Sequence, residues 1–177
     1  MTSSAIISPC GIYRYVLYRS ISGDHKVSKP CLFAMLNPST ADASTDDNTI
    51  RRCIGYAKRE SCTSLTVINL FAMRATDPRE LTAAMRMGRD PIGPENWKHF
   101  TGEIRAHRNA CGLIIAGWGA QPIARTMPMH HRELRDAGAL CLGMTAQGHP
   151  RHPLFVELIE PLVPWTSVPT PKAAKSS

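Results

Sequence analysis

Four short runs of consecutive apolar residues set the hydrophobic pattern of the chain. They read C-L-F-A-M-L at 31–36, L-T-V-I-N-L at 65–70, G-L-I-I-A-G at 112–117 and A-L-C-L-G at 139–143. A continuous apolar run, unlike an alternating one, is typical of a strand that is buried on both faces of a sheet. The pattern therefore predicts four central strands.

Helix signals lie between these runs. Asp46 or Asp47 can cap a helix over Asn48–Arg59, and Asp77-Pro78-Arg79-Glu80 has the spacing of a capping box. We expect further helices over 95–108, 129–137 and 155–162. Strands that alternate with helices indicate an α/β fold, here a three-layer sandwich around a four-stranded, mainly parallel sheet.

The N-terminal part of the chain predicts a small addition to this sheet. Tyr13–Arg19 is rich in aromatic and β-branched residues, and Ser22-Gly23-Asp24 is typical of a turn, so we expect an N-terminal β-hairpin. We expect one domain over 11–165, preceded by a flexible lead-in at 1–10 and followed by a disordered basic tail at 166–177.

The composition is that of a globular protein, with 43% hydrophobic and 20% charged residues in a chain of 177. No apolar run approaches the ~20 residues that span a bilayer, and no secretory signal is visible, so we expect a cytoplasmic protein without a membrane partner. The six cysteines form no C-x-x-C pair, which favours reduced thiols over a metal or iron–sulfur site. No cofactor and no obligate protein partner is implied.

The net charge of the chain points to a class of binding partner. Lysine and arginine total 21 against 14 for aspartate and glutamate, so the formal net charge is +7. This excess favours a polyanionic partner, with DNA or a nucleotide ahead of a membrane surface. A basic globular protein without such a partner is the alternative on charge alone.

Polar residues follow each predicted central strand. Asn37-Pro38-Ser39 follows the first strand, Asn69 lies near the end of the second, and Trp118 follows the third. The segment 145–154 follows the fourth. Because the carboxyl ends of parallel strands meet at one edge of a sheet, we expect these residues to form one polar rim.

Two amides on this rim each have a structural and a functional interpretation. Asn37 either caps the turn at Pro38 or holds a water or a polar ligand group. Asn69 either bonds a neighbouring loop or offers its donor and its acceptor to the edge of a nucleobase.

Charged side chains cluster just after the first rim segment. Asp42, Asp46 and Asp47 precede Arg51 and Arg52. The simpler interpretation is helix capping together with an i,i+4 pair between Asp47 and Arg51. The functional interpretation places one carboxylate on the rim as a general base and the arginines near a phosphate.

The loop G-H-P-R-H-P-L at 148–154 carries His149 and His152, with Arg151 between them. Its two prolines stiffen it, so it either has a structural role or aims an imidazole at a developing anion, with Arg151 near a phosphate. Trp118 either belongs to the core or stacks on a base.

Several of these segments resemble one family of bacteria and phages. M-L-N-P-S-T-A-D-A at 35–43, D-N-T-I-R-R-C at 47–53, N-L-F-A-M-R-A-T-D-P at 69–78 and the loop at 148–154 closely resemble domain of unknown function 1643. The resemblance covers roughly residues 12–163. The family label by itself implies no activity.

The order of the motifs also resembles the uracil-DNA glycosylase superfamily, whose members have a four-stranded parallel sheet. In that superfamily the first motif ends a strand in Asp-Pro or Asn-Pro, like Asn37-Pro38, and a middle strand carries an asparagine, like Asn69. The superfamily motif L-L-W-G-x-x-A-Q is similar to I-I-A-G-W-G-A-Q at 114–121, and H-P-S-P-L is similar to H-P-R-H-P-L at 149–154.

The resemblance implies roles for individual residues. Asn37 would position the attacking water, and Asn69 would read the base. His149, or His152 because of the inserted Arg151-His152 pair, would stabilise the departing base, and Leu154 would fill the gap that a flipped nucleotide leaves. The candidates for an aromatic pocket wall are Phe33, Phe71 and Trp118.

Three functions are compatible with these residues. The leading hypothesis is a DNA glycosylase-like enzyme that hydrolyses the N-glycosidic bond of a pyrimidine base in DNA, modified or unmodified. The alternative is a non-catalytic nucleotide or nucleic-acid binding module, which the missing aspartate of the first motif favours. The third is a metal-dependent hydrolase that uses Asp46, Asp47, His149 and His152.

Overall fold

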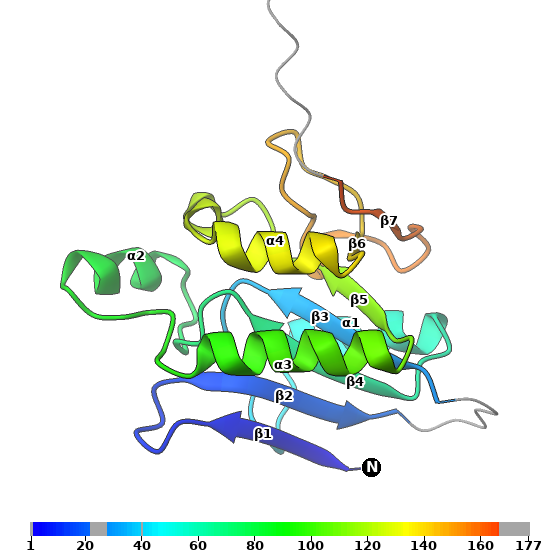
Figure 1. The fold of residues 1–177 in the computed structure, drawn as a ribbon, viewed down its shortest axis with the longest axis horizontal. Coiled ribbons are helices and arrows are strands. Elements are labelled where there is room, and N and C mark those ends of the chain that lie inside the picture. The colour runs from blue at the N-terminus through cyan, green and yellow to red at the C-terminus, as the bar shows by residue number, and fades with distance from the viewer. Residues whose placement is uncertain (1, 22–27, 40, 167–177) are drawn as a thin grey trace, which may run out of the picture.

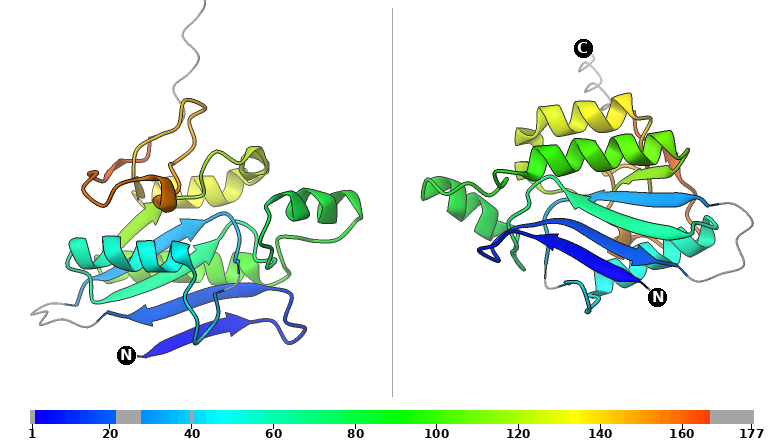
Figure 2. Two further views of the ribbon diagram at one scale, coloured as in Figure 1. Left: turned by 180° about the vertical axis from the view of Figure 1, so that it is seen from behind. Right: turned by 60° about the horizontal axis from the view of Figure 1, so that its bottom comes forward.

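A mixed seven-stranded sheet, in the order β1-β2-β4-β3-β5-β6-β7, forms the centre of the molecule (Figure 1). The computed structural model describes residues 2–21, 28–39 and 41–166. Helix α1 covers one face of the sheet, and helices α3 and α4 cover the other (Figure 2). The strands are β1 (Ser3–Ile7), β2 (Arg14–Ser20), β3 (Pro30–Met35), β4 (Ser64–Asn69), β5 (Leu113–Ala116), β6 (Leu140–Cys141) and β7 (Val163–Pro164). The helices are α1 (Asn48–Arg59), α2 (Arg79–Arg86), α3 (Asn96–Asn109) and α4 (Pro128–Asp136), with short 3-10 helices η1 (Pro122–Thr126) and η2 (Pro153–Phe155).

The four predicted apolar runs form β3, β4, β5 and β6, which lie next to one another. Strand β3 pairs in parallel with β4 on one side and β5 on the other, and β5 pairs in parallel with β6. The carboxyl ends of these strands therefore point to the same edge of the sheet.

The predicted sheet of four mainly parallel strands has too few strands. Strands β1, β2 and β7 extend it at its two sides and pair antiparallel. The predicted lead-in at 1–10 contains strand β1. Its residues S-S-A-I-I are mostly exposed at the sheet edge, so they carry little hydrophobic signal.

The N-terminal hairpin is formed by a different pair of strands from the pair expected. Strand β2 pairs with β1 and with β4, so the hairpin consists of β1 and β2. The expected turn at 22–24 lies outside the described residues, as does the tail from 167 onward.

Helix α1 begins and ends as the sequence predicts. The Asp47 carboxylate accepts a hydrogen bond from the Ile50 N–H at 2.9 Å and so caps the helix. The predicted capping box precedes α2, where the Glu80 carboxylate accepts from the Asp77 N–H at 2.9 Å.

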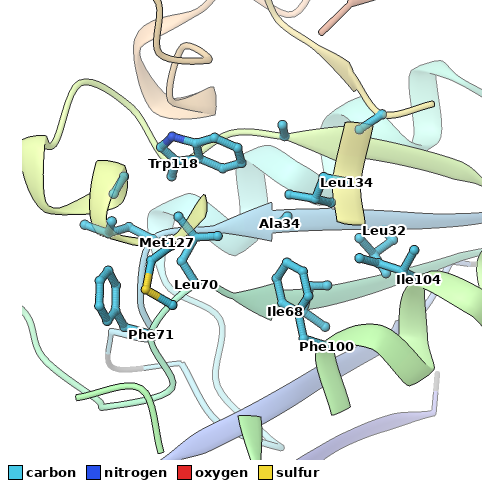
Figure 3. Packing of buried hydrophobic residues seen from close by; sticks show 14 of the residues in the cluster. Leu32, Ala34, Ile68, Leu70, Phe71, Phe100, Ile104, Trp118, Met127 and Leu134 are labelled. Carbon is cyan, nitrogen blue, oxygen red and sulfur yellow. The ribbon is translucent and has the colours of Figure 1, made fainter. Parts of the chain in front are cut away.

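Alternate residues of β3 pack into two separate core layers. Leu32 and Ala34 belong to the layer under α3 and α4, whereas Phe33 and Met35 belong to the layer under α1. Figure 3 shows the first layer, which contains Leu32, Ala34, Ile68, Phe100, Ile104 and Leu134. Burial of both faces explains why the run at 31–36 is continuously apolar.

The predicted helix over 155–162 does not form. After η2 the chain runs without a helix to β7, and its carbonyl groups bond to α1 instead. The Tyr56 hydroxyl lies 3.0 Å from the Val156 oxygen and 2.8 Å from the Glu157 oxygen, and the Arg59 guanidinium donates to the carbonyls of Leu158 and Glu160.

We predict that Tyr56→Phe lowers the free energy of unfolding by about 1 kcal/mol, because two carbonyl groups lose their shared donor. Tyr18→Phe is the control, since the Tyr18 hydroxyl bonds to no described residue, and it should change stability by less than about 0.5 kcal/mol. Urea unfolding measures both. Equal losses would show that the Tyr56 hydroxyl does not anchor this segment.

Candidate functional site

A cavity of about 610 Å³ opens where β3, β4 and β5 end. We call it the central cavity. Its volume lies in the range of small-molecule sites. The predicted site residues that line it are Asn37, Ser39, Asp47, Asn69, Trp118, Arg151, His152 and Leu154, and Gln121 and Thr145 lie beside them. The structure thus brings together residues from all four predicted rim segments.

Asn69, the last residue of β4, is completely buried and lines the central cavity. Neither its amide nitrogen nor its amide oxygen has a hydrogen-bond partner among the residues that the structure describes. Its backbone carbonyl, by contrast, accepts from the Asn96 side chain at 3.2 Å. A buried amide without partners destabilises the folded protein, so such a group on a cavity wall is typical of a binding site.

Asn37 has the structural role expected of it, and it also lines the central cavity. Its amide nitrogen donates to the Ala75 carbonyl at 2.7 Å and to the Pro38 carbonyl at 3.0 Å, which holds the turn after β3. Because these bonds use both N–H groups, only the amide oxygen is left for a water or a ligand. Pro38 itself does not line the cavity.

Asp47 is the carboxylate that reaches the central cavity. Asp46 instead pairs with Arg19 at 2.8 Å, and the Asp42 carboxylate accepts from the backbone of Ser44 and Thr45. The cap of α1 thus also brings a carboxylate to the cavity wall.

Arg51 and Arg52 do not line the central cavity. The Arg51 side chain donates to the Asp46 carbonyl and the Asn48 side chain, and it forms no ion pair with Asp47. The expected i,i+4 pair is therefore wrong, because Asp47 turns toward the cavity while Arg51 turns back along the helix start.

The structure separates the two histidines of the 148–154 loop. His152 lines the central cavity, and its Nδ1 accepts from the Leu154 N–H at 3.3 Å. Burial lowers the pKa of His152 to about 4, although the Asp47 carboxylate opposes that shift. At neutral pH the ring is therefore uncharged, with its proton on Nε2.

His149 lines a second cavity of about 360 Å³, together with Arg125, His131, Arg135 and Trp165. The Arg125 Nε donates to the His149 Nε2 at 3.2 Å. Burial, and then the positive charge of Arg125, lower the pKa of His149. His149 thus does not line the central cavity.

Two glycines allow the 148–154 loop to approach the end of β5. Gly119 has φ +76°, and a Cβ atom there would lie 3.2 Å from the His152 Cβ. A Cβ at Gly117 would lie 3.3 Å from Pro153. The Gly119 N–H donates to the Pro150 carbonyl at 3.0 Å. The sequence Gly117-Trp118-Gly119 therefore serves close backbone approach.

The aromatic candidates lie mainly in the core. Phe33 and Phe71 are fully buried and do not line the cavity. The Trp118 ring, 1% exposed, stacks on His131 at 4.7 Å and still contributes to both cavities. At the side of the central cavity, Phe155 is 78% exposed and lies next to the half-buried Leu154.

Arg14 is a charged lining residue that the sequence analysis missed. It begins β2, which runs antiparallel to β4, so Arg14 lies beside the carboxyl end of β4, and its N–H donates to the Ala72 carbonyl at 2.9 Å. Only 2% of Arg14 is exposed, and burial lowers its pKa to about 10. The sequence contained one signal for its burial, namely a charged residue within the otherwise aromatic and apolar run Y-R-Y-V-L-Y.

The model of a family described as protein of unknown function (DUF1643) matches residues 14–154. The chain belongs to the DUF1643 family. No curated protein and no solved structure matches this DUF1643 protein. Within the described residues, none of its helices has the length and apolar character needed to cross a membrane.

The four residues proposed for metal binding are not together in this DUF1643 protein. Asp47 and His152 line the central cavity, His149 lines the second cavity, and Asp46 pairs with Arg19. Among residues 2–21, 28–39 and 41–166, no three histidine, cysteine, aspartate or glutamate side chains are grouped to hold a metal ion.

We predict that Gly119→Ala displaces His152, whereas Gly138→Ala does not. Both glycines have positive φ, +76° and +72°, so each substitution should cost about 1 to 2 kcal/mol of stability. Only the Cβ at Gly119 meets His152; nothing lies within 4 Å at Gly138. Imidazole NMR shifts of His152 should change in the first variant alone. Unchanged shifts in both would mean that the loop does not depend on this contact.

We predict that the His152 ring titrates with a midpoint of about 4 in proton NMR. Since an unfolded histidine has a pKa of about 6.5, the neutral ring stabilises the fold above that pH, and this stabilisation is lost as the pH falls toward 4. His152→Gln should make the free energy of unfolding less dependent on pH in this window. A midpoint at or above 6.5 would contradict the burial of the ring.

Proposed function

We propose that this DUF1643 protein is a DNA glycosylase-like enzyme that hydrolyses the N-glycosidic bond of a pyrimidine base. The observation that carries the proposal is the buried, unpartnered amide of Asn69 on the wall of the central cavity. A side-chain amide presents one donor side and one acceptor side, which is what the polar edge of a pyrimidine requires. A base bound there would satisfy both groups.

Three cavity side chains have the chemistry for the bond cleavage. A water held by the Asn37 oxygen and the Asp47 carboxylate would attack C1′ of the sugar and give its proton to Asp47. The C1′–N bond would break, and its electron pair would move onto the base. The neutral His152 Nε2–H would donate a hydrogen bond to that developing anion.

The cavity mouth and the charge of the chain support a nucleic-acid substrate. The formal net charge of +7 favours a polyanion. Arg151 lines the cavity, where it could meet a phosphate, and Leu154 and the exposed Phe155 could fill the space left by a flipped base. The motif resemblance to the uracil-DNA glycosylase superfamily adds support from the sequence.

A second candidate function is a binding module for a nucleotide or a nucleic acid, without hydrolysis. The observation in its favour is that the Asp47 carboxylate already accepts a hydrogen bond as the cap of α1. One oxygen of this carboxylate is thus already engaged by the Ile50 N–H, which leaves it fewer acceptor positions for a water. Binding of a pyrimidine nucleotide without release of base would select this function, and affinity for DNA would then fall steeply with salt.

We predict that Asp47→Asn reduces base release at least ~100-fold, the usual contribution of a general base. Asparagine is also a good N-cap, so the helix should remain intact. The assay incubates the protein with oligonucleotides carrying uracil or a modified pyrimidine and measures the free base by mass spectrometry.

The matched control is Asp46→Asn. Asp46 precedes Asp47 but pairs with Arg19 instead of lining the cavity, so its base release should stay within about threefold of the wild type. Equal rates in the wild type and in both variants would exclude Asp47 as the base. Absence of free base from the wild type with every substrate would leave the binding module as the function.

A further inference from the structure

Arg14 is a buried positive charge that faces the central cavity. Its Nη1 donates to the Ala41 carbonyl, but its Nε has no partner within the described part of the chain. It forms no ion pair with any of the described carboxylates. Burial of an arginine is costly unless the charge is paired and its donors are used, so Arg14 lacks the partner that its position requires.

The role of Arg14 as a support for the fold does not account for this arrangement. The bond to Ala41 uses one end of the guanidinium and holds the loop before α1. Arg19, on the same strand, has the contacts that are typical of an arginine with a structural role. Its Nε pairs with Asp46 at 2.8 Å and its other nitrogens donate to backbone carbonyls.

Arg14 and Asn69 lie at neighbouring strand ends and line the same cavity. Strands β2 and β4 pair with Leu17 opposite Val67, so the start of β2 lies beside the end of β4. A ligand that satisfies the Asn69 amide is therefore within reach of the Arg14 guanidinium. The charged lining residues in the described ranges are two arginines, Arg14 and Arg151, and one aspartate, Asp47, so arginine charge exceeds carboxylate charge there.

We propose that the pyrimidine bound in this cavity carries an anionic oxygen group, a carboxylate or a phosphate, and that Arg14 is the residue that selects it. The pyrimidine part of this inference rests on the proposed function. The guanidinium fork would donate to the two oxygens of the anion, a geometry that a lysine cannot reproduce. The anion would take the place of the missing carboxylate partner.

Three probes test the inference by isothermal titration calorimetry: uracil, 5-carboxyuracil and uridine 5′-monophosphate. The first is neutral, the second carries the anion on the base, and the third carries it on the sugar. We expect one anionic probe to bind at least about tenfold more tightly than uracil, and the tighter of the two identifies the source of the anion.

Two arginine variants make the test specific. Arg14→Met should abolish the preference for the anionic probe. Arg51→Met removes the same charge from an exposed arginine outside the cavity and should keep the preference. If Arg14→Met does not fold, the Arg14 Nε–H signal in nitrogen-15 NMR of the wild type replaces it, and that signal should shift with the anionic probe but not with uracil.

Equal affinity for all three probes, a preference that survives in Arg14→Met, an unmoved Arg14 signal, or no binding of any probe would overturn the inference. The result of this binding test can be told apart from the result of the base-release assay that tests the proposed function. An anionic preference in a protein that releases no base would keep the inference and remove the hydrolysis. Release of a neutral base without any such preference would do the reverse.

Discussion

The parallel pairing of β3 with both of its neighbours is the constraint on which the site depends. Met35 lies opposite Asn69 on β4, and Ala34 lies opposite Ala116 on β5, so the three strands end together. The backbone bonds continue past the strand ends, from Leu70 N–H to the Met35 carbonyl at 2.9 Å. Asn37, Asn69 and Trp118 therefore reach one cavity although they are far apart in the chain.

This edge of the sheet carries polar groups that the fold itself does not satisfy. Asn69, Arg14 and Trp118 each have a buried nitrogen that no described residue bonds, and all three line the central cavity. Unsatisfied buried groups are rare in folded proteins because each one destabilises the native state. Other such atoms lie outside this cavity, in Asn96, His107, His130, His131 and Trp165, so the feature particular to the central cavity is Asn69, whose donor and acceptor both lack a partner among the described residues.

Much of this arrangement could be predicted from the sequence, because burial on both faces leaves a clear pattern. The apolar runs that form β3 and β5 and the Asp47 cap of α1 are local signals, and the strand ends gave the amides of the site. Strand β1 gave no such signal, since an edge strand needs few apolar residues. The helix expected after Phe155 fails because α1 binds those carbonyls, a contact between residues about 100 positions apart.

Two features of the site depend on contacts that a sequence does not display. The choice between His149 and His152 is made by the bond from Gly119 to Pro150 and by the η2 turn, which together set the direction of each ring. Arg14 reaches the cavity only because β2 runs antiparallel to β4.

The most direct test of the central claim is the NMR signal of the Asn69 side-chain amide during a titration with a pyrimidine nucleotide. The account predicts that both N–H resonances of this amide shift and become protected from exchange as the nucleotide binds. The Asn96 amide, which already donates to the carbonyls of Asn69 and Leu70, should change much less. A nucleotide that binds while the Asn69 resonances stay unchanged would contradict the account.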